Sequence, residues 1–349
     1  MPSEGVRALP ERPFGTRIDW PIVALTGKKI LMTGGAGFIG TALARRLVAE
    51  NEIVVLDNLH RDSLTGTDLA EHENLRFVQG DVLDLPLLRD LIARATHVVH
   101  LAAIAGVDSV LKSPVRTMRV NLIGTSNVLE AAHEAGSIER LIDFSTSEVF
   151  GTHAYKVEET HVTSQGSVGE ARWTYAVSKL AGEYLAHSYF DEYKLPSTTI
   201  RPFNVYGPGQ LGSGAIHHFT VRALAGDELV IHGDGSQIRA WCFVDDVVEA
   251  LLAMLEREEA VGQVFNVGNP RSVVTVFDLA TRIKRLAESD SEIVFKPLHY
   301  TDVEMRIPNV DKALKLLEWE PRVDLDDGLA RTIAWYRERQ PVQSLAPSR

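Results

Sequence analysis

The sequence has one cysteine, no long apolar run and no cluster of basic residues. Cys242 has no partner in the chain for an internal disulfide. No apolar run approaches the roughly 20 residues that cross a bilayer. The charged, proline-rich start, residues 1–21, lacks the apolar segment of a secretion signal. We therefore expect a cytoplasmic protein with no membrane partner.

The charge balance is acidic. The chain has 36 Lys and Arg against 47 Asp and Glu, which gives a net charge of −11. A protein that binds nucleic acid concentrates cations on one face to neutralise phosphates, so we expect no nucleic-acid partner. With 349 residues, 45% of them hydrophobic and 24% charged, the composition is that of a globular protein with one or two domains.

Short apolar segments alternate with helical patterns over residues 28–203. The segments are rich in β-branched residues and end in turn formers, which indicates buried parallel strands. These expected strands are 28–34, 52–57, 75–81, 97–102, 140–146 and 197–203. The expected helices between them include 38–50, 114–136 and 174–193. Such alternation predicts the α/β class, with a doubly wound parallel (Rossmann) sheet.

From residue 204 the pattern becomes mixed, with short strands among helices expected at 245–256, 276–288 and 325–339. We interpret residues 28–203 as the Rossmann domain. Residues 204–339 then form a smaller mixed α/β substrate lobe, with the chain crossing between the two. Residues 1–27 and 340–349 are an N-terminal extension and a tail, to which we assign no function.

A glycine-rich turn, TGGAGFIG, follows the first expected strand and opens the first helix. Gly34, Gly37 and Gly40 would let backbone N–H groups approach a pyrophosphate at the positive end of that helix. Asp57 ends the next strand, 23 residues after Gly34, where an acid receives ribose hydroxyls. A simple tight turn is the alternative for the glycines, but the context predicts dinucleotide binding. Asp57 would repel the additional phosphate of NADP and favours NAD, whereas the nearby Arg61 argues the other way.

Further residues of the cofactor site are expected where the third and fourth strands end. Asp81 could accept a hydrogen bond from the adenine amino group, although an aspartate there is often only a turn former. Ala102 and Ala103 would leave room for the cofactor. The predicted cofactor-binding residues are Gly34, Gly37, Phe38, Ile39, Gly40, Asp57, Asn58, Asp81, Val82, Leu101, Ala102, Ala103, Tyr175 and Lys179.

A second motif, TYAVSK, puts Tyr175 and Lys179 four residues apart on one face of a helix. A phenol has an ordinary pKa of about 10, and a cation beside it favours the phenolate. The pair is therefore a candidate general base. An amphipathic helix with a solvated lysine is the alternative, which the glycine motif and the hydroxyl-bearing segment 145–147 make less attractive.

The ordered motifs resemble the extended short-chain dehydrogenase/reductases that act on nucleotide sugars. The resemblance covers residues 28–339 and includes TGGAGFIG, LDNL, GDV, HLAA, STSEVFG, YAVSK, RPFNVYGPGQ, GDGSQIRAWCFVDDV and FNVGNP. It implies an enzyme that keeps NAD through its cycle, with Tyr175 as the base and Lys179 as its partner. It also implies that Asn121 supports the proton relay and that a hydroxyl of Thr146 or Ser147 holds the sugar 4-OH.

The pair Ser147-Glu148 resembles the UDP-glucuronate decarboxylases, and DVEMRIP resembles their segment that brings an arginine, here Arg306, into the site. The resemblance predicts conversion of UDP-glucuronate to UDP-xylose. Nucleotide-sugar 4-epimerases and 4,6-dehydratases stay as alternatives because they carry several of the same motifs. An NAD-binding sensor without catalysis is the alternative from a different class. Glu148 could also be a loop carboxylate bound by backbone N–H groups, and Arg306 a surface partner of Asp302 or Glu304.

The same resemblance implies that Asn204 and Arg239 meet the substrate diphosphate, while the strand containing His232 runs past the base. Capping of a helix end is the alternative for Arg239. His217 and His218 lack partners at metal-ligand spacing, so we predict no metal site. By analogy, helices 114–135 and 174–193 pair with their copies in a homodimer. The candidate apolar contacts on their outer faces are Val128, Leu129, Leu180 and Tyr184.

Overall fold

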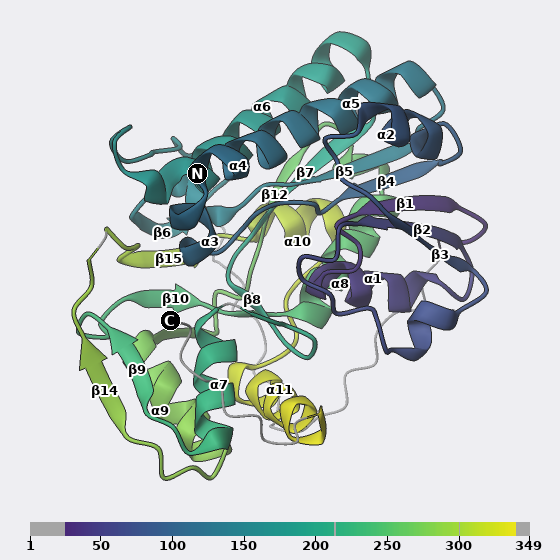
Figure 1. Cartoon of the computed structure of the whole chain (residues 1–349). Coiled ribbons are helices and arrows are strands. Elements are labelled where there is room, and N and C mark those ends of the chain that lie inside the picture. Colours follow the sequence, from purple (N-terminus) through teal and green to yellow (C-terminus); the bar gives the residue numbers. More distant parts are fainter. Residues whose placement is uncertain (1–24, 213, 300, 340–349) are drawn as a thin grey trace.

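The computed structural model describes residues 25–339 except 213 and 300. Its largest unit is a seven-stranded parallel sheet in the order β12-β7-β5-β4-β1-β2-β3 (Figure 1). The strands are β1 Lys29–Thr33, β2 Glu52–Asp57, β3 Leu75–Gln79, β4 His97–His100, β5 Arg140–Phe144, β7 Ser197–Pro202 and β12 Val264–Val267. The chain reverses its direction of travel across the sheet at β1, which lies between β2 and β4. This order confirms the predicted doubly wound α/β fold, in which ligands bind at the carboxyl ends of the strands beside the reversal.

Helices cover both faces of this sheet (Figure 1). One face carries α2 Leu85–Ile92, α4 Pro114–Met118, α5 Gly124–Ala135 and α6 Thr174–Tyr193. The other carries α1 Phe38–Leu47 and α8 Val244–Glu256. The expected apolar outer faces of α5 and α6 need a correction, because Val128 and Leu129 are fully buried in the core under α2. Leu180 is half-buried, and Tyr184 is 66% exposed.

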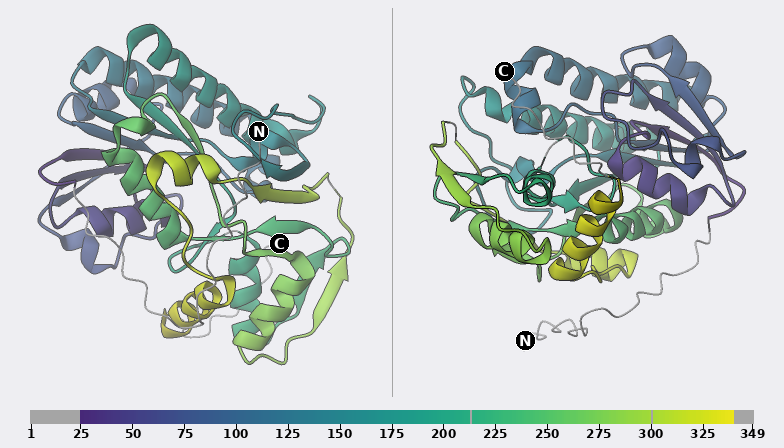
Figure 2. Two further views of the ribbon diagram at one scale, coloured as in Figure 1. Left: turned by 180° about the vertical axis from the view of Figure 1, so that it is seen from behind. Right: turned by 60° about the horizontal axis from the view of Figure 1, so that its bottom comes forward.

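A smaller lobe holds a second sheet in the order β13-β10-β15-β6 and two two-stranded sheets, β11-β8 and β14-β9. Its strands are β6 His153–Val157, β8 Val205–Tyr206, β9 Leu229–His232, β10 Ile238–Ala240, β11 Cys242–Phe243, β13 Val273–Thr275, β14 Ile293–Lys296 and β15 Met305–Pro308. The remaining α-helices are α3 Val107–Lys112, α7 Ala215–Ala225, α9 Val276–Leu286, α10 Asp311–Leu317 and α11 Leu325–Arg339. Figure 2 shows most of the green and yellow segments gathered beside the main sheet.

The chain crosses between the two parts. β6 directly follows β5 along the chain but pairs with β15 of the lobe. β12 comes after residue 204 but pairs with β7 and completes the main sheet. Because the sheets share these connections, the end of β5 lies next to the lobe strands β10 and β15. Within the described part of the chain, no helix combines the length and the apolar character that crossing a bilayer requires.

Candidate active site

The glycine-rich turn joins β1 to α1 with almost no space around it. Gly34 has φ +70°, and a Cβ atom there would lie 2.5 Å from the backbone nitrogen of Ala102. A Cβ on Gly40 would lie 2.6 Å from the Cα of Gly35. Only glycine fits both contacts, so the first turn of α1 starts directly at the crevice beside β4.

Asp57 closes the same turn from the end of β2. Its carboxylate accepts hydrogen bonds from the backbone N–H groups of Ala36 (3.1 Å) and Leu59 (2.8 Å). Burial raises the pKa of Asp57, and these two bonds oppose that effect. The carboxylate therefore lies at the rim of the crevice, within reach of a ligand that follows the turn.

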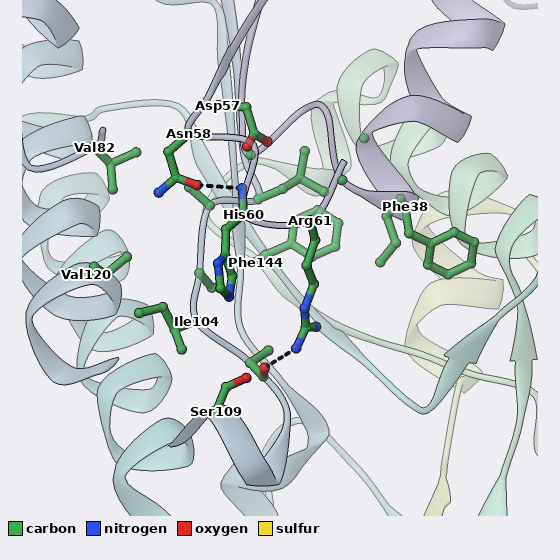
Figure 3. Close-up of a pocket in the computed structure, with 18 of the residues that line it drawn as sticks. Phe38, Asp57, Asn58, His60, Arg61, Val82, Ile104, Ser109, Val120 and Phe144 are labelled. Carbon is green, nitrogen blue, oxygen red and sulfur yellow. Dashed lines mark hydrogen bonds between the residues drawn. The ribbon is translucent and has the colours of Figure 1, made fainter. Parts of the chain in front are cut away.

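The crevice contains a cavity of about 620 Å³ (Figure 3). All fourteen residues that the sequence predicts for cofactor binding line it. They come from the glycine turn, the ends of β2, β3 and β4, and the start of α6. A concave site that combines a glycine cradle, a helix N-terminus and an acid at the next strand end fits a dinucleotide.

Arg61 crosses this cavity. Its guanidinium donates a hydrogen bond from Nη2 to the carbonyl oxygen of Ala105 (2.9 Å), as Figure 3 shows, and burial lowers its pKa. Arg61 therefore links the loop after β2 to the loop after β4. Lys112 and Arg116 also line the cavity, and no sequence motif predicts them there.

Tyr175 and Lys179 on α6 line the same cavity. Burial raises the pKa of Tyr175, and the charge of Glu148 raises it further, while the Thr146 hydroxyl and Arg306 lower it. Lys179 is 2% exposed, and burial lowers the pKa of its ammonium group. A buried phenol therefore needs nearby positive charge before it can act as a base at neutral pH.

Asn121 lies in a π-helical turn, Arg119–Ile123, between α4 and α5. Its side-chain oxygen accepts from the backbone N–H of Ile104 (2.8 Å). Its amide donates to the Ile104 carbonyl (3.1 Å) and to the Ser178 hydroxyl (3.0 Å). Asn121 does not line the cavity, and it ties the loop after β4 to the helix that carries Tyr175.

Glu148 lies among three arginines. Its carboxylate accepts a hydrogen bond from Nη1 of Arg172 (2.6 Å) and lies 3.6 Å from Nη1 of Arg306. Arg306 and Arg239 are register partners on β15 and β10. Burial raises the pKa of Glu148, but the charges of Arg306, Arg172 and Arg239 outweigh burial and lower it. Glu148 is therefore an anion at neutral pH.

The guanidinium of Arg306 has N–H donors that the described residues do not use. It is 5% exposed, and its Nε and Nη2 have no hydrogen-bond partner among the described residues. Buried donors are normally paired, so these two are candidates for binding an anionic ligand. Arg239 is engaged with Asp302 (3.2 Å), and burial lowers its pKa to about 10.

The other residues predicted to bind the substrate lie outside the cluster of Glu148 and the three arginines. The Asn204 amide donates to the carbonyl oxygen of Ala240 (2.9 Å), which fixes the crossing from β7 into the lobe. Ser147 is buried in the turn after β5, and Thr146 Oγ1 accepts from the Glu148 N–H (3.2 Å). His232 is exposed at the end of β9.

Two further observations concern residues outside the predicted cofactor set. Sequence reasoning missed Arg172, because its contact with Glu148 joins positions 24 residues apart in the chain. Nδ1 of His217 contacts the hydroxyl of Tyr336 (2.6 Å). Among the described residues, no group of three or more His, Cys, Asp or Glu has an arrangement suited to a metal ion.

A Rossmann sheet with a glycine turn and a Tyr-Lys pair on one helix defines a short-chain dehydrogenase/reductase. The chain belongs to the NAD dependent epimerase/dehydratase family, whose model matches residues 30–268. The predicted family, the enzyme class and NAD as cofactor are thereby confirmed.

Several relatives are similar over most of their length. The chain is 33% identical over 327 residues to UDP-N-acetyl-alpha-D-glucosaminuronate decarboxylase of Bacillus cytotoxicus, covering 89% of this chain and 98% of that one. It is 32% identical to UDP-glucuronic acid decarboxylase 1 of Xenopus tropicalis, covering 91% and 74%. Among solved structures, UDP-glucuronic acid 4-epimerase of Bacillus cereus in complex with UDP-glucuronic acid and NAD has a TM-score of 0.80 and 29% identity, covering 89% and 99%.

Proposed function

We propose that the protein is an NAD-dependent decarboxylase of a UDP-linked uronic acid, with UDP-glucuronate as substrate and UDP-xylose as product. The observation that carries this proposal is the buried guanidinium of Arg306 beside Glu148, in which two donors have no hydrogen-bond partner within residues 25–339, 213 and 300 excepted. A planar guanidinium suits a carboxylate because it can donate two parallel hydrogen bonds. The decarboxylases among the relatives support the same reading.

The reaction begins at the sugar C4. Tyr175, as the phenolate, takes the proton of the 4-OH while the C4–H bond breaks, which leaves a ketone at C4. The bound NAD supplies the hydride acceptor and returns the same hydride at the end. Arg306 and Arg172 favour the phenolate by their positive charge. Lys179, which lines the same cavity, is the proposed further cation. Thr146 and Ser147 are the proposed hydroxyl partners of the 4-OH, and Asn121 supports the proton relay by holding the loop at Ile104.

The C4 ketone makes the uronate a β-keto acid. Breaking the C5–C6 bond releases CO2 and leaves the electron pair as an enolate across C4 and C5. Tyr175, now protonated, can donate to the enolate oxygen and stabilise its charge. A proton from solvent then adds at C5, and the pentose forms when the hydride returns to C4 and the C4 oxygen takes back the proton of Tyr175.

Glu148 orients the substrate and does not act as an acid. Its lowered pKa makes it an anion that can accept hydrogen bonds from sugar hydroxyls or hold Arg306 in place. Loss of water from a sugar needs an acid for the leaving hydroxyl as well as a base. The family resemblance implies an Asp-Glu pair at this position in the 4,6-dehydratases, whereas this chain has Ser147-Glu148, which argues against a 4,6-dehydratase.

The test is incubation of the purified protein with UDP-glucuronate and catalytic NAD, followed by mass spectrometry and proton NMR of the sugar. Decarboxylation predicts release of CO2, UDP-xylose as product and no net NADH. UDP-N-acetylglucosaminuronate is tested in parallel, because a relative of this chain carries that name. No CO2 from either substrate would contradict the proposal.

The Tyr175→Phe variant separates an enzyme from a non-catalytic sensor. Removing the phenolic oxygen is expected to lower turnover by about 10²- to 10⁴-fold, while NAD binding and the melting temperature stay unchanged. An NAD-binding sensor would keep its behaviour in this variant. Equal activity of the variant and the natural protein would contradict the role of Tyr175.

A UDP-glucuronate 4-epimerase is the second candidate, favoured by the similar structure of the Bacillus cereus enzyme. Both activities share the C4 ketone and differ in whether the C5–C6 bond breaks. The same incubation distinguishes them, since an epimerase leaves the mass of the sugar unchanged and inverts C4. The binding roles proposed for Asn204, Arg239 and His232 apply to either reaction, because both use the same diphosphate and base.

A homodimer in the cytoplasm belongs to the same proposal. Tyr184 and Val177 on α6 and Ile123 beside α5 are large apolar side chains that are exposed in the single chain. Burying them between two copies would remove apolar surface from water. Tyr184→Glu is expected to convert the dimer to a monomer in sedimentation, and an unchanged sedimentation coefficient would contradict this interface.

A further inference from the structure

A row of buried polar side chains crosses the centre of the main sheet behind the catalytic pair. Thr33, His100, Asp143 and Thr199 are register partners on β1, β4, β5 and β7. All four are at most 3% exposed. Register partners in a parallel sheet project to the same face, so the four side chains stand side by side under α5 and α6. The proposed reaction uses none of them.

Asp143 differs from its neighbours in the row because its side chain can carry a charge and accepts no hydrogen bond from the described residues. Both of its carboxylate oxygens are buried and have no hydrogen-bond partner among the described residues. His100 is already engaged, with Nδ1 2.6 Å from the Thr33 hydroxyl and Nε2 3.0 Å from the Thr125 hydroxyl. Thr199 is neutral. A buried carboxylate without partners is costly, which indicates a role other than stability.

The helix packed over Asp143 brings two charged groups. Lys179 and Glu183, one turn apart on α6, both act on Asp143 electrostatically. Glu183 is neutralised separately, since Nε of Arg201 donates to both of its oxygens (3.0 and 3.1 Å). Asp143 therefore offers Lys179 a carboxylate that has no hydrogen-bond partner in the described part of the chain.

We propose that Asp143 is a positioning residue that acts through Lys179. It is the counter-charge that keeps the buried ammonium protonated and holds it under Tyr175. This inference rests on the proposed function, because Lys179 matters only if Tyr175 is the base. A buried lysine without an anion nearby loses its proton readily, and its support for the phenolate is then lost.

The charge states agree with this arrangement. Burial raises the pKa of Asp143 to about 6, so the group is ionised at neutral pH. Burial lowers the pKa of Lys179. The negative charges of Asp143 and Glu183 raise it again, and Asp143 has the larger effect of the two. Burial lowers the pKa of His100 to about 3, so the imidazole between β1 and α5 adds no charge.

The test is a titration of Tyr175 in the NAD-loaded protein. The phenolate of Tyr175 is followed by its near-ultraviolet absorbance, as the difference between each protein and its own Tyr175→Phe variant. Removing the negative charge in Asp143→Asn is expected to move this titration to higher pH by about one unit, because Lys179 loses its proton and no longer favours the phenolate. The alkaline limb of kcat/KM is expected to move to lower pH, because it reports the earlier loss of the Lys179 proton.

Two matched variants separate the charge of Asp143 from a general disturbance of the buried row. Asp143→Glu keeps the charge and is expected to titrate like the natural protein. Thr199→Val changes the neighbouring side chain of the row without changing charge and is expected to leave the titration in place. An unshifted titration in Asp143→Asn, or one that moves to lower pH, would overturn the proposal even if turnover is reduced. An equal shift in Thr199→Val would overturn it too.

Failure of this proposal and failure of the decarboxylase assignment have different signatures. The phenolate titration needs NAD but no sugar, so it gives a result even if UDP-glucuronate does not react. Thermal melts of the three variants monitor folding. Replacing an unpartnered buried carboxylate by an amide is expected to keep or raise the melting temperature, whereas a structural role predicts a loss.

Discussion

The two halves of the site are built in different ways. The cofactor half consists of turns and strand ends that follow one another along the chain, and its shape depends on the small residues Gly34, Gly40 and Ala102. The proposed substrate half consists of charged side chains from β10, β15, the turn after β5 and the segment before α6. The first half is defined by steric fit of the backbone, and the second by charge balance.

This difference determines how each half should respond to mutation. A steric contact with backbone atoms cannot relax, so one added methyl group has a large and local effect. A charge cluster is a network in which Glu148 has Arg172 and Arg306 as neighbours, so each single change affects several interactions. Single substitutions in each half can separate these two behaviours.

In the cofactor half, Gly34→Ala is expected to weaken NAD binding by about 100-fold or more. The added Cβ would lie 2.5 Å from the Ala102 backbone nitrogen, at a φ of +70° that alanine rarely adopts. The measurement is NAD affinity by isothermal titration calorimetry. Gly66→Ala is the matched control, since Gly66 has φ +77° and nothing within 4 Å of an added Cβ. Equal effects of the two variants would show that the contact with Ala102 is unimportant.

In the substrate half, Arg172→Met is expected to reduce the free energy of unfolding by about 3 kcal/mol, because it leaves a buried carboxylate with one partner fewer. Turnover is expected to fall while NAD affinity stays constant. Adding Glu148→Gln to Arg172→Met should recover part of the lost stability, and urea unfolding of the four proteins measures this coupling.

The control for that pair is an exposed one. Arg94 and Asp90 form an ion pair at 2.7 Å in which both side chains are more than half exposed. Arg94→Met is expected to change the free energy of unfolding by less than about 1 kcal/mol. Strictly additive losses in Arg172→Met and Glu148→Gln would mean that the two side chains do not act as a unit.

The same contrast explains what the sequence could predict. The glycine spacing, Asp57 and the pair Tyr175-Lys179 are local patterns with a direct physical meaning, and all of them line one cavity. Arg172 carries no such pattern, because its importance comes from meeting Glu148 across 24 residues. Likewise, helical periodicity predicts that Val128 lies on an apolar face of its helix. It does not tell whether that face is covered within the chain, as it is here, or by a second copy.

The smallest effect is expected beneath the cofactor half, at His100. Burial lowers its pKa to about 3, against an ordinary value of 6.5 in the unfolded chain. Above pH 6.5 the imidazole is neutral in both states, and below it only the unfolded chain takes up the proton. This group therefore makes the native state less stable by about 1.4 kcal/mol per pH unit as the pH falls from 6.5 towards 3.

His100→Asn removes this dependence. Between pH 7.5 and 5.5 the variant is expected to lose about 1.4 kcal/mol less stability than the natural protein in urea unfolding. Asp143 and His97 titrate in both proteins, so their contributions cancel in this difference. Thr125→Val removes a hydrogen-bond partner of His100 but keeps the buried imidazole, so it should lower stability equally at both pH values. If His100→Asn keeps the full pH dependence, the imidazole accepts a proton in the folded protein, and the row beneath the cavity carries a charge that Lys179 must also accommodate.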